Sequence, residues 1–237
     1  MFQSILSGQI FLLIHGAWHG GWCWRGIVPR LERAGHAVFA PDIKGATLAA
    51  WTDSICEILT AQSGPVILVG HSRGGIVISQ AAERFPDKVA RLVYVNGFLL
   101  RKGESVLRVL REDDASPLLR HAVLTRDRSG WALDAAQSRS MFYGMCPSED
   151  VEFAQSRLTP EPVAPLLTPV KITAENFGRV PRAYIHCLRD RAIPIELQQR
   201  MVAALPCEPV RTIDTDHSPF FSAPDRLTAC LLELVIH

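Results

Sequence analysis

The chain of 237 residues is long enough for one sizeable domain or two small ones, and 48% hydrophobic with 21% charged residues is ordinary for a globular protein. A net charge of +1 gives no electrostatic basis for binding nucleic acid or an anionic membrane surface. The start of the chain lacks the basic and cleavage features of a signal peptide, and no apolar run approaches ~18 residues. The six cysteines are scattered without metal-ligand spacing. We therefore expect a cytoplasmic protein in a reducing compartment, without a disulfide framework.

Apolar runs alternate with segments of helical periodicity along the first hundred residues. Strands are predicted at residues 10–14, 37–40, 65–69 and 89–95, and helices at 24–34, 48–61 and 76–85. The runs at 10–14 and 37–40 are continuous and apolar, which is typical of strands buried on both faces. Strands that alternate with helices at short intervals indicate a parallel sheet with helices on both faces.

This alternation stops after the fourth strand and resumes near residue 182. Residues 99–173 hold no clear buried strand, only short helical pieces separated by Pro and Gly. Strands at 183–188 and 209–213 and helices at 194–205 and 224–235 then restore the pattern. The sequence thus predicts a core of residues 1–98 and 181–237 with a helical cap of residues 99–180. The cap should lie over the carboxyl edge of the sheet, where active sites of open α/β sheets are found.

The central motif is Gly70-His-Ser-Arg-Gly-Gly75, between a predicted strand and a predicted helix. A Gly-x-Ser-x-Gly pattern in this setting is the nucleophile elbow, a strained turn that projects the hydroxyl of Ser72 above the sheet. Side chains at Gly70 and Gly74 would collide with the neighbouring strand and helix. An ordinary glycine-rich connection is the alternative interpretation.

A serine hydroxyl needs an adjacent base, and on this fold the chain order is serine, acid, histidine. Of the eight histidines, His217 lies in an irregular loop after a late strand, so we predict that it is the base. His71 adjoins the serine, but adjacent elbow side chains point apart. His15 and His19 flank a glycine-rich loop, and we expect them to support that loop.

The acid is predicted to be Asp190, which directly follows the strand at 183–188. Asp214 and Asp216 are too near His217 in sequence to reach round its imidazole. Some members of this fold place the acid one strand earlier, where this chain has Asn96, and an amide cannot carry the charge. A surface charge cluster with the flanking arginines is the alternative role for Asp190.

Two backbone amides are needed to stabilise the developing oxyanion. We predict that the amide of Arg73, directly after the nucleophile, supplies one and that Ala17, in the loop after the first strand, supplies the other. Because an amide donor does not depend on its side chain, the Arg73 side chain is expected to extend into solvent. In the alternative interpretation, the Arg73 side chain reaches a carboxylate of the substrate.

Four segments together resemble one branch of the α/β-hydrolase superfamily. They are His15-Gly-Ala-Trp-His-Gly-Gly-Trp-Cys-Trp24, Gly70-His-Ser-Arg-Gly-Gly75, Asp190-Arg-Ala-Ile-Pro194 and Asp216-His217. The branch contains plant methylesterases, salicylic-acid-binding esterases and hydroxynitrile lyases, with bacterial esterase relatives. The resemblance implies an α/β-hydrolase fold, Ser72, Asp190 and His217 as triad, Ala17 and Arg73 as oxyanion donors, and no metal or cofactor. The lyases of the branch carry a lysine after the histidine, whereas this chain has Ser218, so lyase chemistry is not expected.

The sequence thus predicts a carboxylic-ester hydrolase that works through an acyl-serine intermediate. Aromatic residues favour a small aromatic or lipophilic ester, and we expect substrate contacts from Trp18, Trp131, Phe142 and Tyr143, although packing of the cap is an alternative role for the cap aromatics. Two other functions stay open: hydrolysis of an amide, carbamate or C–C bond, and ligand binding by a non-catalytic receptor. The expected partner is a small molecule, not nucleic acid or membrane, and a homodimer is left open.

Overall fold

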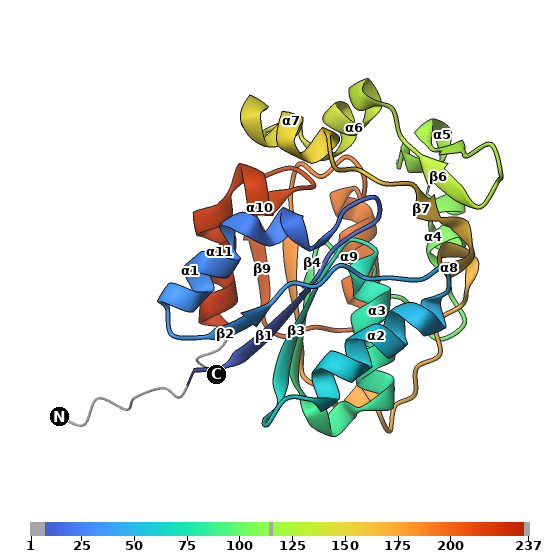
Figure 1. Cartoon of the computed structure of the whole chain (residues 1–237). Helices are drawn as coiled ribbons and strands as arrows, with labels where there is room; N and C mark the ends of the chain where they lie inside the picture. The colour runs from blue at the N-terminus through green and yellow to red at the C-terminus, as the bar shows by residue number, and fades with distance from the viewer. Residues whose placement is uncertain (1–7, 114–115, 235–237) are drawn as a thin grey trace.

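The computed structural model describes residues 8–113 and 116–234, and its centre is a six-stranded sheet (Figure 1). All neighbouring strands pair in parallel, in the order β2-β1-β3-β4-β8-β9. The strands are β1 (Ile10–Ile14), β2 (Ala37–Phe39), β3 (Val66–His71), β4 (Val89–Val95), β8 (Arg182–Cys187) and β9 (Val210–Ile213). The predicted parallel sheet is confirmed, with strand bounds close to those expected from the apolar runs.

Helices cover both faces of the sheet. Helix α1 (Val28–Arg33) packs against α11 (Pro224–Glu233) on one face, and α2 (Leu48–Thr60) packs against α3 (Gly74–Arg84) on the other (Figure 1). Helix α9 (Ile195–Ala204) contacts β8. Helix α2 illustrates the pattern, because Trp51, Ile55 and Leu59 recur every four residues and are all buried.

Two sequence-based expectations are corrected in the first part of the chain. Strand β2 is not buried on both faces, because it lies at the edge of the sheet and leaves Phe39 40% exposed. The helix expected at residues 24–34 is divided into a 3-10 helix, η1 (Gly21–Gly26), and α1. Pro29 has no N–H to continue an incoming helix, so it occupies the first turn of α1 instead.

The segment between β4 and β8 contains helices and also a small antiparallel sheet, which the sequence did not predict. Its helices are α4 (Val106–Arg111), α5 (Leu118–His121), α6 (Ala135–Phe142), α7 (Ser148–Gln155), α8 (Val163–Leu167) and the 3-10 helix η3 (Phe177–Arg179). Its strands, β5 (Val123–Leu124), β6 (Gly130–Ala132) and β7 (Glu161–Pro162), pair in the order β5-β6-β7. Strands of two or three residues are too short to show an alternating hydrophobic pattern.

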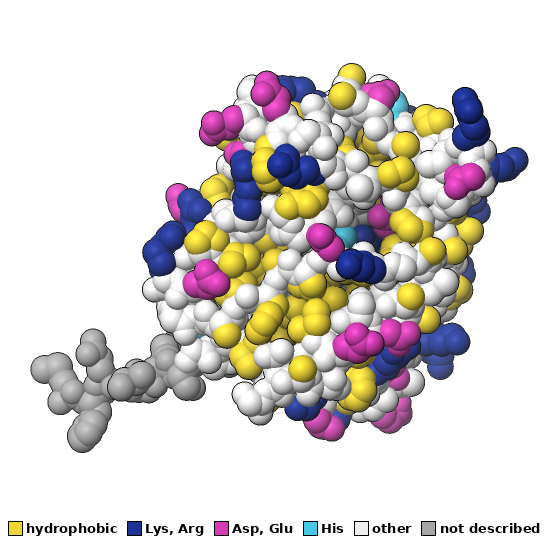
Figure 2. All heavy atoms as spheres, viewed as in Figure 1, with side chains coloured by type: hydrophobic (Ala, Val, Ile, Leu, Met, Phe, Trp, Pro, Cys, Tyr) yellow, Lys and Arg dark blue, Asp and Glu magenta, His cyan; other side chains and the backbone are white. Residues whose placement is uncertain are grey.

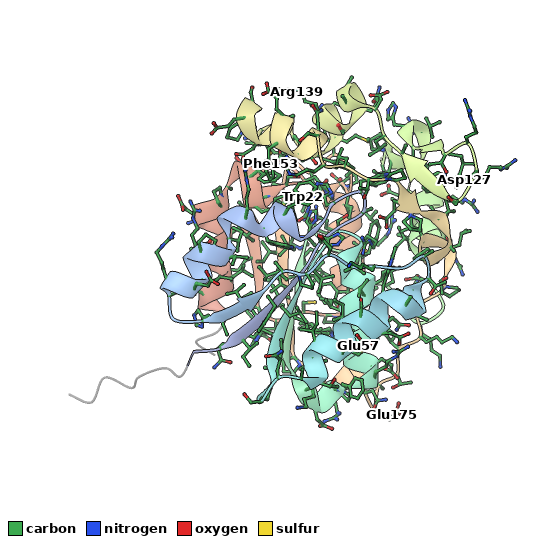
Figure 3. The ribbon with its side chains drawn as sticks, viewed as in Figure 1. Trp22, Glu57, Asp127, Arg139, Phe153 and Glu175 are labelled. Atoms are coloured by element: carbon green, nitrogen blue, oxygen red, sulfur yellow. The ribbon has the colours of Figure 1, made fainter. Side chains whose placement is uncertain are left out.

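We refer to residues 99–180 as the cap, because much of this segment lies across the carboxyl ends of the core strands (Figure 1). Phe153 on α7 points toward Trp22 of η1 (Figure 3), and the two rings are edge to face with centroids 5.8 Å apart. The Arg25 guanidinium lies over the same Phe153 ring, 3.6 Å from its centroid. Aromatic and cation–π packing thus holds helix α7 of the cap against η1 of the core.

The described part of the chain has no helix whose length and apolar character would allow it to cross a bilayer. On the face drawn in Figure 2, acidic and basic side chains are interspersed, and hydrophobic side chains gather near its middle.

Candidate active site

Ser72 lies in the turn between β3 and α3 and has a φ of +50°, a left-handed conformation that is strained for serine. Glycine is needed on both sides of this turn. A Cβ at Gly74 would lie 2.6 Å from the carbonyl oxygen of Ile14 on β1, and one at Gly70 would lie 2.8 Å from the carbonyl oxygen of Gly74. The close packing of strand and helix inferred from the motif therefore exists, and it leaves Ser72 at the carboxyl edge of the sheet.

Asp190 and His217 meet at the same edge, in the loops that follow β8 and β9. His217 Nδ1 lies 2.8 Å from Asp190 Oδ2, and both side chains are buried. The other carboxylate oxygen, Oδ1, accepts hydrogen bonds from the backbone amides of Ala192 at 2.8 Å and Ile193 at 2.9 Å. These amides hold the carboxylate in one orientation, with Oδ2 directed at the imidazole.

The residue that precedes the serine contacts the loop that carries the histidine. His71 Nε2 donates to the carbonyl oxygen of His217 at 2.8 Å, and the two rings lie 4.7 Å apart. Within the described residues, Ser72 Oγ makes no direct hydrogen bond with His217. In unliganded enzymes this contact is often long and tightens when substrate binds.

Asn96 is a site residue that sequence reasoning considered only as an acid and then set aside. It directly follows β4 with a φ of +33°, a conformation that asparagine tolerates better than most residues. Its Nδ2 donates to Asp190 Oδ2 at 2.7 Å and to the carbonyl oxygen of His217 at 3.1 Å. Its position at the end of a core strand was the available signal, because any polar side chain there faces the other strand ends.

Several polar groups of the loop after β1 have partners. The carbonyl of Gly16 accepts from His15 Nδ1 at 2.9 Å, and that of Ala17 accepts from His19 Nδ1 at 2.7 Å. The amide of Trp18 donates to Glu161 Oε2 at 3.1 Å. The amides of Ala17 and of Arg73 have no acceptor among the described residues, and within the loop the same holds for the amides of Gly16, His19 and Gly20. Two free amides in a buried loop and a helix N-terminus are what a developing oxyanion requires.

The histidines beside this loop are neutral supports. Ile43 N donates to His15 Nε2, and the Tyr143 hydroxyl donates to His19 Nε2, so in each ring the proton resides on Nδ1. Burial lowers the pKa of His15 well below 6.5 and lowers that of His19 to about 4. Burial likewise lowers the pKa of His71.

The expectation that the Arg73 side chain extends into solvent is wrong. Its side chain is only 3% exposed, and its Nε lies 2.9 Å from Glu161 Oε1 on β7, although the N–H bond is not aligned with that oxygen. Its guanidinium also lies over the ring of Trp51, 4.1 Å from the centroid. A buried arginine needs a partner charge, and here that charge comes from the cap, far away in sequence.

A narrow pocket lies at Ser72 beneath the cap. Its lining consists of aliphatic and aromatic side chains apart from Ser72 and Arg73. Of the residues predicted to contact substrate, Trp18 and Trp131 line this pocket, and the indole of Trp18 donates to the carbonyl of Trp131 at 2.7 Å.

The other two residues predicted to contact substrate lie outside this lining. The Phe142 ring packs on that of His217, with centroids 5.1 Å apart, and on that of Trp18 at 5.7 Å. Tyr143 is buried and directs its hydroxyl to His19. Phe142 thus shields the imidazole, whereas Tyr143 stands behind the loop that it helps to support.

No three His, Cys, Asp or Glu side chains within residues 8–113 and 116–234 are arranged to hold a metal ion.

The sequence and the fold both match known proteins. The profile described as "Alpha/beta hydrolase family" matches residues 11–229. Methylesterase 7 and putative methylesterase 11, chloroplastic, both of Arabidopsis thaliana, are each 34% identical to the chain. The alignments cover 94% of the chain and 95% of methylesterase 7, and 97% of the chain and 64% of putative methylesterase 11. The chain therefore spans less than two thirds of the second relative.

Two solved structures extend the comparison. Polyneuridine aldehyde esterase superposes with a TM-score of 0.85 at 26% identity, covering 96% of this chain and 99% of that one. A pyrethroid hydrolase from Sphingobium faniae JZ-2 superposes with a TM-score of 0.87 at 29% identity, covering 96% and 97%. With its matched profile and its methylesterase relatives, the chain belongs to the alpha/beta hydrolase family, in the branch of the plant methylesterases.

Proposed function

We propose that this protein is an ester hydrolase, a serine-dependent carboxylesterase in which Ser72, His217 and Asp190 form the catalytic triad. The observation that carries the proposal is the convergence of three features at one sheet edge. A strained serine, a buried His217–Asp190 pair joined at 2.8 Å and two unpartnered amides meet there, at the mouth of an apolar pocket.

In the first half-reaction, Ser72 Oγ attacks the ester carbonyl carbon while His217 Nε2 accepts the hydroxyl proton. Asp190 keeps the other proton of the imidazole on Nδ1, so that Nε2 is free to act as the base. The carbonyl oxygen becomes an oxyanion, and the amides of Ala17 and Arg73 stabilise it. The C–O bond to the alcohol then breaks, and His217 returns the proton to the leaving alkoxide oxygen.

In the second half-reaction, a water molecule attacks the acyl-serine carbonyl, and His217 accepts a proton from that water. The tetrahedral species collapses with cleavage of the bond to Ser72 Oγ, which recovers its proton from His217. The products are a carboxylic acid and the free enzyme. No other group is required to balance the two steps.

The pocket supports a small aromatic or lipophilic ester as the substrate. The guanidinium of Arg73 is already paired with Glu161, so the lining carries no unpaired charge that would favour an ionic acyl group. Flat indole surfaces at Trp18 and Trp131 suit an aromatic or branched apolar acyl chain. Relatives named as methylesterases agree with a small leaving alcohol.

A fluorophosphonate probe tests the proposal, because it reacts only with an activated serine. Labelling and hydrolysis of a p-nitrophenyl ester should both occur in the wild type and disappear in Ser72→Ala. The matched control is Ser156→Ala, which changes an exposed serine on the cap and should keep both activities. A folded wild-type protein that binds aryl esters but neither reacts with the probe nor hydrolyses them would instead be a receptor on this fold.

A further inference from the structure

The buried ion pair between Arg73 and Glu161 joins the nucleophile turn to the cap. Arg73 directly follows Ser72, and Glu161 opens strand β7. Both residues are buried, with exposed fractions of 2% and 3%, so neither charge is solvated by bulk water. Apolar side chains could hold the two surfaces together at least as well, so the buried pair calls for a role besides adhesion.

Each member of the pair also holds the loop after β1. Glu161 Oε2 accepts the amide of Trp18 at 3.1 Å, and Arg73 Nη2 donates to the carbonyl oxygen of Gly16 at 3.0 Å. Ala17 lies between these two contacts. The pair therefore forms hydrogen bonds with the loop immediately before and immediately after the Ala17 amide, which we assign to the oxyanion hole.

Trp18 itself is in a strained conformation, with a φ of +62°, which is uncommon for a bulky side chain. A loop in such a conformation persists only when its surroundings hold it there. The cap supplies a second tether as well, since Thr159 N donates to the carbonyl oxygen of Trp18 at 3.1 Å. Both peptide groups that flank Trp18 are thus bound by residues 159–161 of the cap.

We propose that Glu161, through its ion pair with Arg73, is a positioning residue that sets the distance and direction of the two oxyanion-binding amides. The inference rests on the proposed function. A cap residue then completes an oxyanion hole whose donors both belong to the core. The amides of Ala17 and Arg73 point at the developing oxyanion only when β7 is packed against the loop after β1. Packing of the cap on the core and stabilisation of the transition state are therefore coupled.

The test separates positioning from mere structural support by comparing ground-state and transition-state binding. The variants are Glu161→Gln and the charge-free double variant Arg73→Met with Glu161→Leu, which leaves no buried charge unpaired and keeps the Arg73 position's backbone amide. Phenylboronic acid forms a tetrahedral adduct with an activated serine and serves as the transition-state probe. In each variant we expect kcat for a p-nitrophenyl ester to fall about tenfold to a hundredfold. KM should stay within about threefold, and Ki for phenylboronic acid should rise in step with the fall in kcat.

The matched control is Asp150→Asn on α7. It breaks another ion pair between cap and core, with Arg25 of η1 at 2.5 Å, but does not touch the loop after β1. This variant should keep wild-type kcat and Ki. A folded double variant with wild-type kcat and Ki would overturn the inference, as would a loss of thermal stability alone. Failure of the wild type to hydrolyse the ester or bind the boronate would instead refute the proposed function.

Discussion

Replacement of Asp190 by asparagine is the sharpest perturbation of the proposed triad, because the structure dictates how the new amide must lie. The backbone amides of Ala192 and Ile193 donate to Oδ1 of the carboxylate, and only an oxygen can accept there. The Nδ2 group of the asparagine must therefore face His217 Nδ1, where it acts as a donor. The imidazole is then forced to carry its proton on Nε2 and cannot accept the proton of Ser72.

The expected loss follows from this change of tautomer. Fixing a catalytic imidazole in the wrong tautomer while the geometry stays intact lowers kcat by roughly 10⁴ in related triads. That factor corresponds to about 5.5 kcal/mol of activation free energy. The new amide also faces Asn96 Nδ2, which lies 2.7 Å from Asp190 Oδ2, so two donors are opposed and some stability is lost as well.

The same geometry predicts a rescue. Asn96 Nδ2 lies 3.1 Å from His217 Nδ1, so an aspartate oxygen in its place could accept the imidazole proton. In the exchanged variant, Asn96→Asp with Asp190→Asn, the new carboxylate would accept from both the imidazole and the asparagine, but it would lose the bond that Asn96 donates to the carbonyl oxygen of His217, so the recovery should be partial. We expect kcat for a p-nitrophenyl ester to recover at least roughly tenfold over Asp190→Asn alone, a gain of about 1.4 kcal/mol. Asn96→Ala in the Asp190→Asn background is the control and should not recover.

Two results would refute this reasoning. Near-normal turnover in Asp190→Asn would show that another group orients the imidazole. A folded exchanged variant no more active than Asp190→Asn would show that the position after β4 cannot serve His217, whatever its distance in the structure. Thermal unfolding of each variant separates these results from loss of the fold.

Three further predictions follow from other parts of the site. Burial holds the pKa of His19 at about 4, below its unfolded value of ~6.5, so the native state binds fewer protons between these pH values. His19 should therefore contribute about 3 kcal/mol to the unfolding free energy lost between pH 6.5 and 4, in addition to the losses from His15 and His71. Chemical denaturation should show a smaller loss in His19→Gln than in the wild type, whereas equal losses would contradict the neutral support role. Trp131 lines the pocket and Tyr143 does not. Trp131→Ala should therefore raise the ratio of kcat/KM for bulky acyl esters to kcat/KM for acetate esters by about tenfold, while Tyr143→Phe should leave this ratio unchanged. The reverse pattern would refute this account of the pocket. Ser218 is buried and carries no charge to stabilise departing cyanide, so cyanide release from mandelonitrile should not exceed the buffer rate, and release that disappears in Ser72→Ala would contradict the esterase assignment.

Local pattern was sufficient to predict the core of the fold. Most core strands contain a short apolar run bounded by turn residues, and most core helices show helical periodicity, so the parallel sheet could be predicted from neighbouring residues. The same locality explains why the elbow could be recognised, since strand, turn and helix are contiguous. Asp190 and His217 were placed at one sheet edge by a topological rule, because the carboxyl ends of parallel strands share that edge.

What the sequence could not determine depends on contacts between distant segments. The edge position of β2 depends on strand order, which the composition of a single strand does not encode. The strands of the cap are too short for a hydrophobic period and exist only because β6 pairs with both of its neighbours.

The two largest revisions at the site have the same cause. Asn96 became a partner of Asp190 only when the ends of β4 and β8 were placed side by side. Arg73 was expected in solvent because only its backbone amide was given a role, and only the folded cap brings Glu161 against its side chain. Propensity and periodicity act over a few residues, whereas burial of a charge is decided by whether a distant chain segment supplies its counter-charge.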